Sequence, residues 1–130
     1  MQHSDWECRD LVNMYDHYMF PVHSEPQLLS DKEMQDRVNY MLEEIHELVT
    51  AVARHDMAEI ADALVDIVVF CKGTAVMMGL PWEQLWKEVM RANMDKRPGE
   101  NPKRPGFTHD LVKPEGWVPP RIQEVLDGSL

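Results

Sequence analysis

The sequence predicts an all-α fold: a four- to five-helix bundle with an extended, proline-rich C-terminal arm, assembling as an oligomer. Apolar residues recur at the 3.6-residue spacing of amphipathic helices over four segments between residues 5 and 94. Six of the nine prolines lie between residues 94 and 121, a density that no helix tolerates. No segment carries the signals of a strand, so we expect no sheet.

Length and charge limit the class of protein. The 130 residues suit one domain, residues 1–130, with a modest core, and 44% hydrophobic residues exclude a disordered chain. Residues 1–90 hold 6 Lys and Arg against 17 Asp and Glu, whereas residues 91–130 hold 7 against 6. Such an acidic body argues against binding to a nucleic-acid backbone.

Neither a membrane span nor a leader peptide is expected. No apolar run approaches the ~18 to 20 residues that cross a bilayer, and residues 1–20 lack a basic start followed by an apolar stretch. The two cysteines, Cys8 and Cys71, form no metal-binding spacing. We interpret them as reduced core thiols of a cytoplasmic protein.

The first two predicted helices span residues 5–20 and about 30–54. Ser4 with Glu7 and Ser30 with Glu33 have the spacing of a capping box, and Pro21 ends the first helix. His17 and His23 could contact a ligand near this bend, although a single histidine more often has a surface or core role.

The third helix is predicted from an N-cap at Asp56 to Met78, with Gly79 beyond its end, and the fourth begins after Pro81. The buried face expected for the fourth helix consists of Trp82, Leu85, Trp86, Val89 and Met90. A last short helix is expected near residues 122–126, after the proline-rich arm at 94–121. Because two of the helices are largely apolar, we expect a homodimer or homotetramer.

Six carboxylates interrupt the second and third helices at helical spacing: Glu43, Glu44, Glu47, Glu59, Asp62 and Asp66. The third helix is apolar nearly all round, which is typical of a buried helix. Buried carboxylates require a positive partner, and the nearby cations Arg54 and Lys72 are too few. Oxygen ligands favour Mg²⁺, or Mn²⁺ in its place, although a solvated acidic stripe is the alternative.

Such a site suits phosphoryl chemistry, in which a carboxylate accepts a proton from water while a metal neutralises phosphate oxygens. No glycine-rich phosphate loop occurs in the sequence. The cations for the phosphates must therefore come from the C-terminal arm, which carries Lys96, Arg97, Lys103, Arg104 and Lys113.

Four motifs in order resemble the all-α nucleoside triphosphate pyrophosphohydrolase superfamily, which includes the MazG proteins, the dimeric dUTPases and the phosphoribosyl-ATP pyrophosphohydrolases. They are EExxE at residues 43–47, GTAVMMG at 73–79, ANMDK at 92–96 and KPEGW at 113–117. The likeness covers residues 6–126 and is closest to the small single-domain MazG-like proteins.

The resemblance implies cleavage of a nucleoside triphosphate between its α and β phosphates, releasing a monophosphate and pyrophosphate. It assigns metal binding to Glu43, Glu44, Glu47 and Asp66. It also implies that Glu44 or Glu47 orients or deprotonates the attacking water molecule. The second motif of the superfamily is usually ExxD, and Glu59 with Asp62 has that spacing. The distance to Gly73 instead favours Asp66 as the aspartate of the motif, which places Ala63 where the glutamate is expected, and Asp62 could then replace that glutamate. Nucleotide contacts are implied for Asn93, Lys96, Lys113 and His17.

Two other functions stay open at this point. One is hydrolysis of a phosphoribosyl nucleotide on the same scaffold, as in the phosphoribosyl-ATP pyrophosphohydrolases. The other is a non-catalytic helical module that binds a metal or a partner protein.

Overall fold

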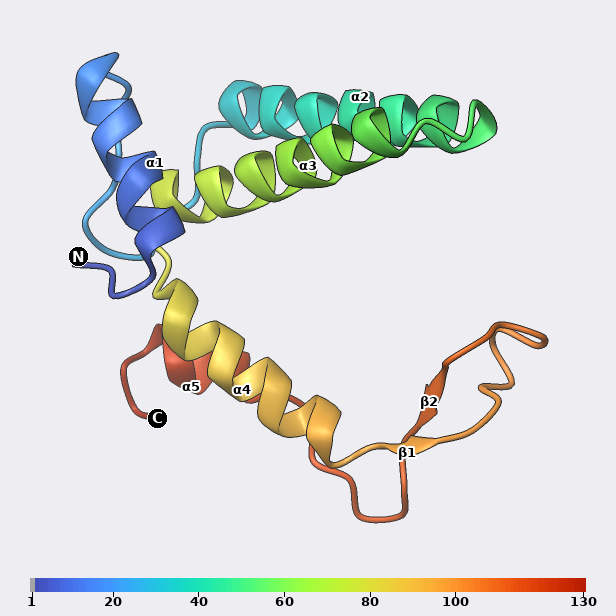
Figure 1. Ribbon diagram of the computed structural model, residues 1–130. Helices are drawn as coiled ribbons and strands as arrows, with labels where there is room; N and C mark the ends of the chain where they lie inside the picture. The colour runs from blue at the N-terminus through green and yellow to red at the C-terminus, as the bar shows by residue number, and fades with distance from the viewer. Residues whose placement is uncertain (1) are drawn as a thin grey trace. The chain divides into compact units, whose positions relative to one another are not determined.

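The computed structural model describes residues 2–130, which form five helices and one pair of short strands (Figure 1). The chain divides into two compact units, residues 1–82 and residues 83–130, and each is described by itself. The all-α prediction is confirmed for most of the chain. The oligomer and the extended character of the arm stay predictions.

The first unit contains three helices: α1 (Trp6–His17), α2 (Asp31–Ala53) and α3 (Met57–Met77). Helices α2 and α3 run side by side as a hairpin, and α1 packs on α3 (Figure 1). The small core is formed by Cys8, Leu11 and Tyr15 of α1 with Val76 of α3. This packing anchors the base of the hairpin and leaves its distal half to contacts between α2 and α3.

The start of α1 differs from the prediction. The N-cap is Asp5 rather than Ser4, because the Asp5 carboxylate accepts a hydrogen bond from the Glu7 amide at 2.9 Å. The same carboxylate forms an ion pair with the ammonium of Lys72 on α3 at 2.6 Å, which an uncharged serine could not form. The helix ends at His17 rather than at Phe20, and Met19 just beyond it has a φ of 58°.

The ends of α2 and α3 agree with the prediction. Ser30 and Glu33 form the reciprocal capping box, and the Asp56 side chain caps α3 by accepting from the Glu59 amide at 3.1 Å. Gly79 follows α3 with a φ of 69°. A Cβ atom at this position would lie 2.5 Å from the Glu25 carbonyl oxygen, so only glycine fits.

The prediction that α3 is buried nearly all round is wrong for the isolated chain. Its exposed residues include Leu64 at 50%, Val65 at 62% and Val68 at 42% of full exposure. Cys71, predicted to be a core thiol, is exposed, whereas Cys8 is buried. A helix with apolar residues all round can bury only the faces that α1 and α2 cover.

The second unit holds the rest of α4 (Trp82–Met94), the strands β1 (Arg97–Pro98) and β2 (Leu111–Val112), and α5 (Ile122–Leu126). The antiparallel strand pair was not predicted, since two residues per strand carry no periodic signal. The buried face predicted for α4 is also wrong in part, because Trp86 is 56% exposed while Glu88 is buried. No helix lies between Met94 and Ile122, as the prolines predict.

Across residues 2–130, no single helix is long and apolar enough to span a membrane. Helices α3 and α4 satisfy that test of length and composition only when they are counted together across the break between them.

Candidate metal centre

Helices α2 and α3 bring together three of the predicted carboxylates. Glu44 and Glu47 lie one turn apart on α2, and Asp66 projects from α3. One oxygen atom from each of the three side chains lies within 4.8 Å of the others. Three carboxylate oxygens at this separation can bind one cation, since hard divalent ions accept oxygen ligands at about 2.0–2.6 Å.

The electrostatics of this carboxylate cluster favour a positive ligand. Burial is the largest cause that raises the pKa of Glu44, followed by a hydrogen bond with Glu47 and the charges of Glu47, Asp66 and Asp62. The pKa of Asp66 is likewise raised, first by burial and then by the charges of Asp62 and Glu47. The negative charges of Glu44, Glu47, Asp62 and Asp66 therefore repel one another, and a bound cation would relieve this repulsion.

One oxygen of the cluster has no partner. Glu44 Oε2 is buried and accepts no hydrogen bond, and none of Glu44, Glu47 and Asp66 forms an ion pair with the described residues. An unsatisfied buried carboxylate oxygen is costly. The donor set and the orphaned oxygen together fit a divalent cation such as Mg²⁺ or Mn²⁺.

The other predicted metal ligands lie at the edge of the cluster. Asp62 lies one turn before Asp66 and forms a hydrogen bond with it that contributes to the raised pKa of Asp66. Glu43 is exposed and does not belong to the group of three close oxygens. Ala63 is buried, so a side chain without a ligand atom occupies the position where the superfamily has a glutamate.

A polar pocket of about 310 Å³ opens beside the cluster between α2 and α3. Glu47, Asp62 and Glu59 line it together with Arg54 and His46. Arg54, which the sequence analysis considered only as a possible counter-ion, is therefore a cation in the same pocket as two candidate ligands. The pocket provides space for phosphate groups next to the carboxylates.

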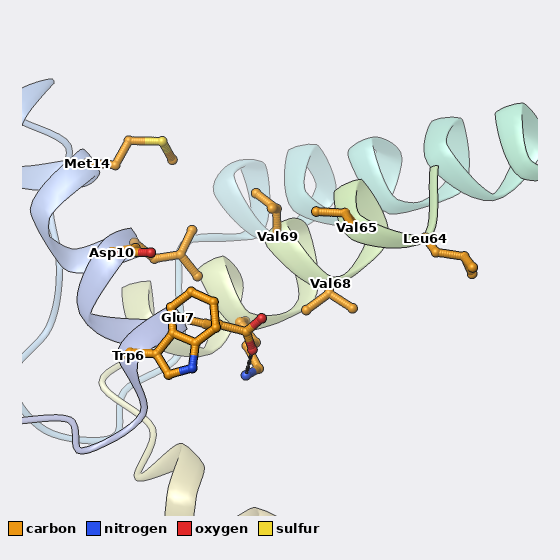
Figure 2. Close-up of a pocket in the computed structure, with 10 residues that line it drawn as sticks. Trp6, Glu7, Asp10, Met14, Leu64, Val65, Val68 and Val69 are labelled. Atoms are coloured by element: carbon orange, nitrogen blue, oxygen red, sulfur yellow. Dashed lines mark hydrogen bonds and ion pairs between the residues drawn. The ribbon is translucent and has the colours of Figure 1, made fainter. Parts of the chain in front are cut away.

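A second, mostly apolar pocket of about 490 Å³ lies between α1 and α3. Figure 2 shows Trp6 and Met14 on the α1 side and Val65 and Val68 on the α3 side. None of the carboxylates of the cluster lines this pocket. Lys72, at one end of this pocket, is bound to Asp5 and Glu7 and therefore does not neutralise the metal cluster.

Arg37 is a buried cation that the sequence analysis did not single out. Its guanidinium donates to the Thr74 hydroxyl at 3.0 Å, to the Tyr15 hydroxyl at 3.1 Å and to the Phe70 carbonyl at 3.4 Å. No carboxylate among the described residues pairs with it, and three aromatic rings lie within 6 Å of its central carbon, those of Tyr15, Tyr40 and Phe70. In the sequence, the one signal of this arrangement is Gly73, because a glycine in a helix leaves room for another group to approach the backbone closely.

His17 has a contact with the ring of Tyr18 at 4.9 Å and none with the carboxylate cluster among the described residues. It is exposed in the last turn of α1. Its predicted role in substrate binding stays a prediction.

The remaining predicted substrate residues gather in the second unit. The Lys96 amide donates to the Asn93 carbonyl at 3.1 Å, at the end of α4. The ammonium groups of Lys96 and Lys113 lie 5.3 and 4.8 Å from the centre of the Trp117 ring. These side chains, distant in sequence, are therefore neighbours in the structure.

The comparison with protein families matches this chain to the phosphoribosyl-ATP pyrophosphohydrolase model over residues 11–93. The chain belongs to this family. The family is part of the MazG-like superfamily, so the predicted resemblance is confirmed. The phosphoribosyl-ATP pyrophosphohydrolase match includes α2, α3 and the whole carboxylate cluster, and it extends into α4. A search of curated proteins found no match.

Proposed function

We propose that this protein is a metal-dependent nucleotide pyrophosphohydrolase that cleaves nucleoside triphosphates between the α and β phosphates. The membership of a pyrophosphohydrolase family supports the class of reaction. The observation that carries the proposal is the uncompensated cluster of Glu44, Glu47 and Asp66, with its orphaned oxygen, beside a polar pocket.

The cluster suits Mg²⁺ or Mn²⁺ held by Glu44, Glu47 and Asp66, with Asp62 as an additional ligand or as the partner that orients Asp66. When bound, such a cation neutralises charge on phosphate oxygens and lowers the pKa of a nearby water molecule. Glu43 stands at the solvent side of the same helix and is the remaining candidate ligand.

The reaction requires one water molecule. Its oxygen forms a bond to the α phosphorus, and the bond from that phosphorus to the bridging oxygen breaks. Glu44 or Glu47 accepts the proton of the water, and the leaving pyrophosphate carries away the bridging oxygen. Arg54, lining the same pocket as Glu47, is placed to attract the phosphate groups.

The experiment is to incubate the protein with a panel of ribo- and deoxyribonucleoside triphosphates, with Mg²⁺, with Mn²⁺ and with a chelator, and to identify the products by chromatography. We expect monophosphate and pyrophosphate only with metal. Asp66→Asn and Glu47→Gln should lower kcat by at least about a hundredfold, within the range that acid–base groups contribute.

Asp36→Asn is the matched control, because Asp36 is a surface carboxylate of α2 that pairs with Lys32 one turn away. This variant should retain the activity of the parent. Equal activity of the Asp66→Asn, Glu47→Gln and parent proteins would contradict the proposal.

A second candidate function is hydrolysis of phosphoribosyl-ATP, which is favoured by the name of the matching family. The panel therefore includes this nucleotide. A kcat/KM for phosphoribosyl-ATP well above that for every plain triphosphate would select this function. Stabilisation by metal without turnover of any nucleotide would instead identify a non-catalytic module.

We also propose that the protein self-associates as a homodimer or homotetramer. The support comes from the exposed apolar residues of the α2–α3 hairpin, which include Leu42, Val49, Leu64 and Val65, and from the mostly apolar pocket beside them. Large apolar side chains exposed in such numbers favour association. A second copy of the same hairpin, with the same apolar faces, is the partner that we propose. The cytoplasmic location stays a prediction.

A further inference from the structure

The rings of Tyr40 on α2 and Phe70 on α3 form a stacked pair next to the carboxylate cluster. Their centres are 4.9 Å apart, and the angle between their planes is 17°. Glu44 follows Tyr40 by four residues on α2, and Asp66 precedes Phe70 by four residues on α3. Residues at this spacing are neighbours on a helix surface, about 5.4 Å or one turn apart along the axis. The ring pair therefore lies one turn from the cluster on both helices.

This ring pair is accessible to a ligand. Tyr40 is 44% exposed, and Phe70 is half-buried behind it. Together the two rings offer a flat aromatic surface at the edge of the hairpin. Nucleobases stack on aromatic side chains of this kind, because every base has a π face.

Arg37 borders the same two rings. Its central carbon lies 5.8 Å from the centre of the Tyr40 ring and 5.4 Å from that of Phe70. The Nε and Nη2 groups have acceptors in the protein, whereas Nη1 donates to no acceptor among residues 2–130. In that range, Glu44 Oε2 is the one fully buried side-chain nitrogen or oxygen without a partner. The Nη1 group therefore keeps contact with the surface.

The surroundings of Arg37 favour an oxygen acceptor from outside the protein. Arg37 is only 8% exposed, and its hydrogen-bond partners in the described residues are two hydroxyl groups and one carbonyl, all uncharged. These bonds and the neighbouring rings offset part of the cost of burying the charge. A carbonyl oxygen that accepts from Nη1 would add a charge-assisted hydrogen bond, which is stronger than one between neutral groups.

We propose that Arg37, Tyr40 and Phe70 form the site that recognises the nucleobase, and that this site selects bases with a carbonyl oxygen over adenine. The inference rests on the proposed function, in which the cluster acts at the α phosphate. A single sugar separates that phosphate from the base, which suits a base site one turn away.

Each residue of this base site has its own role. The base stacks on the exposed part of the Tyr40 ring, which Phe70 supports from behind. Arg37 Nη1 donates to the carbonyl oxygen of the base. Adenine carries an amino group in place of that oxygen, so donor would meet donor and the hydrogen bond would be lost.

Inosine and adenosine nucleotides are the matched ligands for the test, because the purine carries a carbonyl oxygen in inosine where it carries an amino group in adenosine. The experiment measures binding of inosine and adenosine monophosphate to the full chain by titration calorimetry in Mg²⁺. Neither ligand has an anhydride bond to cleave. We expect the parent to bind the inosine nucleotide at least about tenfold more tightly, as one hydrogen bond to a charged group provides. Equal affinities would overturn the proposal.

Two variants test the stacking role of Tyr40. Tyr40→Phe keeps the ring and should bind inosine monophosphate as the parent does. Tyr40→Leu removes the ring and should weaken binding by about tenfold, the lower range for stacking of a base. Phe107→Leu is the matched control, because Phe107 is an aromatic residue, 65% exposed, in the loop between β1 and β2. Equal binding by Tyr40→Leu and Phe107→Leu would refute the stacking role.

Arg37→Lys tests the selection of the base. This variant keeps the positive charge and removes the planar group that presents Nη1. We expect the ratio of the inosine to the adenosine affinity to fall toward one, while circular dichroism reports the fold. An unchanged ratio in the folded variant would contradict the role of Arg37. If this buried substitution prevents folding, the exposed Tyr40→Leu and its control still decide the proposal.

Kinetics separates this inference from the proposed function. With inosine triphosphate, Tyr40→Leu should raise KM about tenfold at nearly constant kcat, because stacking is equal in the ground and transition states. Asp66→Asn should lower kcat instead. Monophosphate binding that depends on Tyr40, without turnover of any triphosphate, would support the base site and contradict the enzyme. Metal-dependent turnover with the same KM for Tyr40→Leu and the parent would support the enzyme and contradict the base site.

Discussion

At the scale of single residues, the contact between α1, α2 and α3 depends on Gly73. A Cβ atom at this position would lie 2.1 Å from the Tyr15 hydroxyl oxygen and 2.8 Å from a guanidinium nitrogen of Arg37. Both groups are buried and bonded to each other, so neither can move without breaking that hydrogen bond. The absence of a side chain at 73 therefore allows Arg37 to lie against α3.

We predict that Gly73→Ala lowers the free energy of unfolding by about 1–3 kcal/mol, the usual cost of overpacking, although alanine is the better helix former. Denaturant unfolding followed by circular dichroism measures the change. Tyr15→Phe removes the hydroxyl that the new methyl group would meet. The double variant should therefore lose less than the two single variants together.

These three variants and the parent form a double-mutant cycle. If the losses of unfolding free energy of the two single variants simply add in the double variant, the proposed clash is contradicted. The same cycle examines why Arg37 is buried without a carboxylate, because Tyr15→Phe also removes one of its hydrogen-bond acceptors. Sequence reasoning named the acids of α2 but passed over this arginine. A single cation on an amphipathic helix carries no sign of burial until the neighbouring helices are placed.

At the scale of elements, Glu88 links α4 to the segment that leads into α5. Its buried carboxylate accepts from the Arg91 side chain, from the Arg121 side chain and from the Arg121 amide. Hydrogen bonds from Arg91 and then from Arg121 lower the pKa of Glu88 to about 2, against an ordinary value of 4.5. Trp117 adds a second link, through the Ala92 carbonyl.

This lowered pKa predicts how stability depends on pH. The folded state favours the charged form of Glu88, so its contribution is fully present above pH 4.5 and is lost as the pH falls from about 4.5 to about 2. We expect Glu88→Gln to lower the melting temperature at pH 7, and we expect the gap from the parent to close as the pH falls through that window. Thermal unfolding at several pH values measures it.

Glu124→Gln, which changes an exposed acid of α5 with the same loss of charge, is the control for net charge. This variant should show no such closing gap. A constant difference between the Glu88→Gln and parent proteins from pH 7 to pH 2 would contradict the assigned role of Glu88.

At the scale of the whole molecule, the exposed apolar faces of α2 and α3 bear on assembly. Val65 is 62% exposed and lines the mostly apolar pocket between α1 and α3 (Figure 2). We predict that light scattering after size-exclusion chromatography will show the parent as a dimer or tetramer. Val65→Asp should shift it toward the monomer, because a carboxylate placed in an apolar interface loses its hydration.

Leu28→Asp is the comparison variant, since Leu28 is an apolar residue, 82% exposed, in the connection before α2. It should leave the assembly unchanged. A parent protein that is monomeric at high concentration would refute the proposed self-association, and so would an equal effect of both substitutions.

Local sequence patterns were sufficient to predict the helices and most of their ends. The Ser30–Glu33 capping box, the Asp56 cap, Gly79 and the proline-rich segment act through neighbouring residues, so local patterns are sufficient to predict them. The sequence also identified the superfamily and named the acidic residues of α2 and α3. These properties depend on spacing along the chain, which the sequence contains directly.

The packing of the helices and loops established which of these residues lie close together, and the sequence did not predict it. Glu44, Glu47 and Asp66 lie close enough together for their carboxylate oxygens to bind a single cation, whereas Glu43 is exposed. The packing also placed two lysines 17 residues apart on one tryptophan. Such contacts depend on how helices and loops pack across long separations in sequence, and a periodic pattern says which face a residue occupies but not what lies opposite.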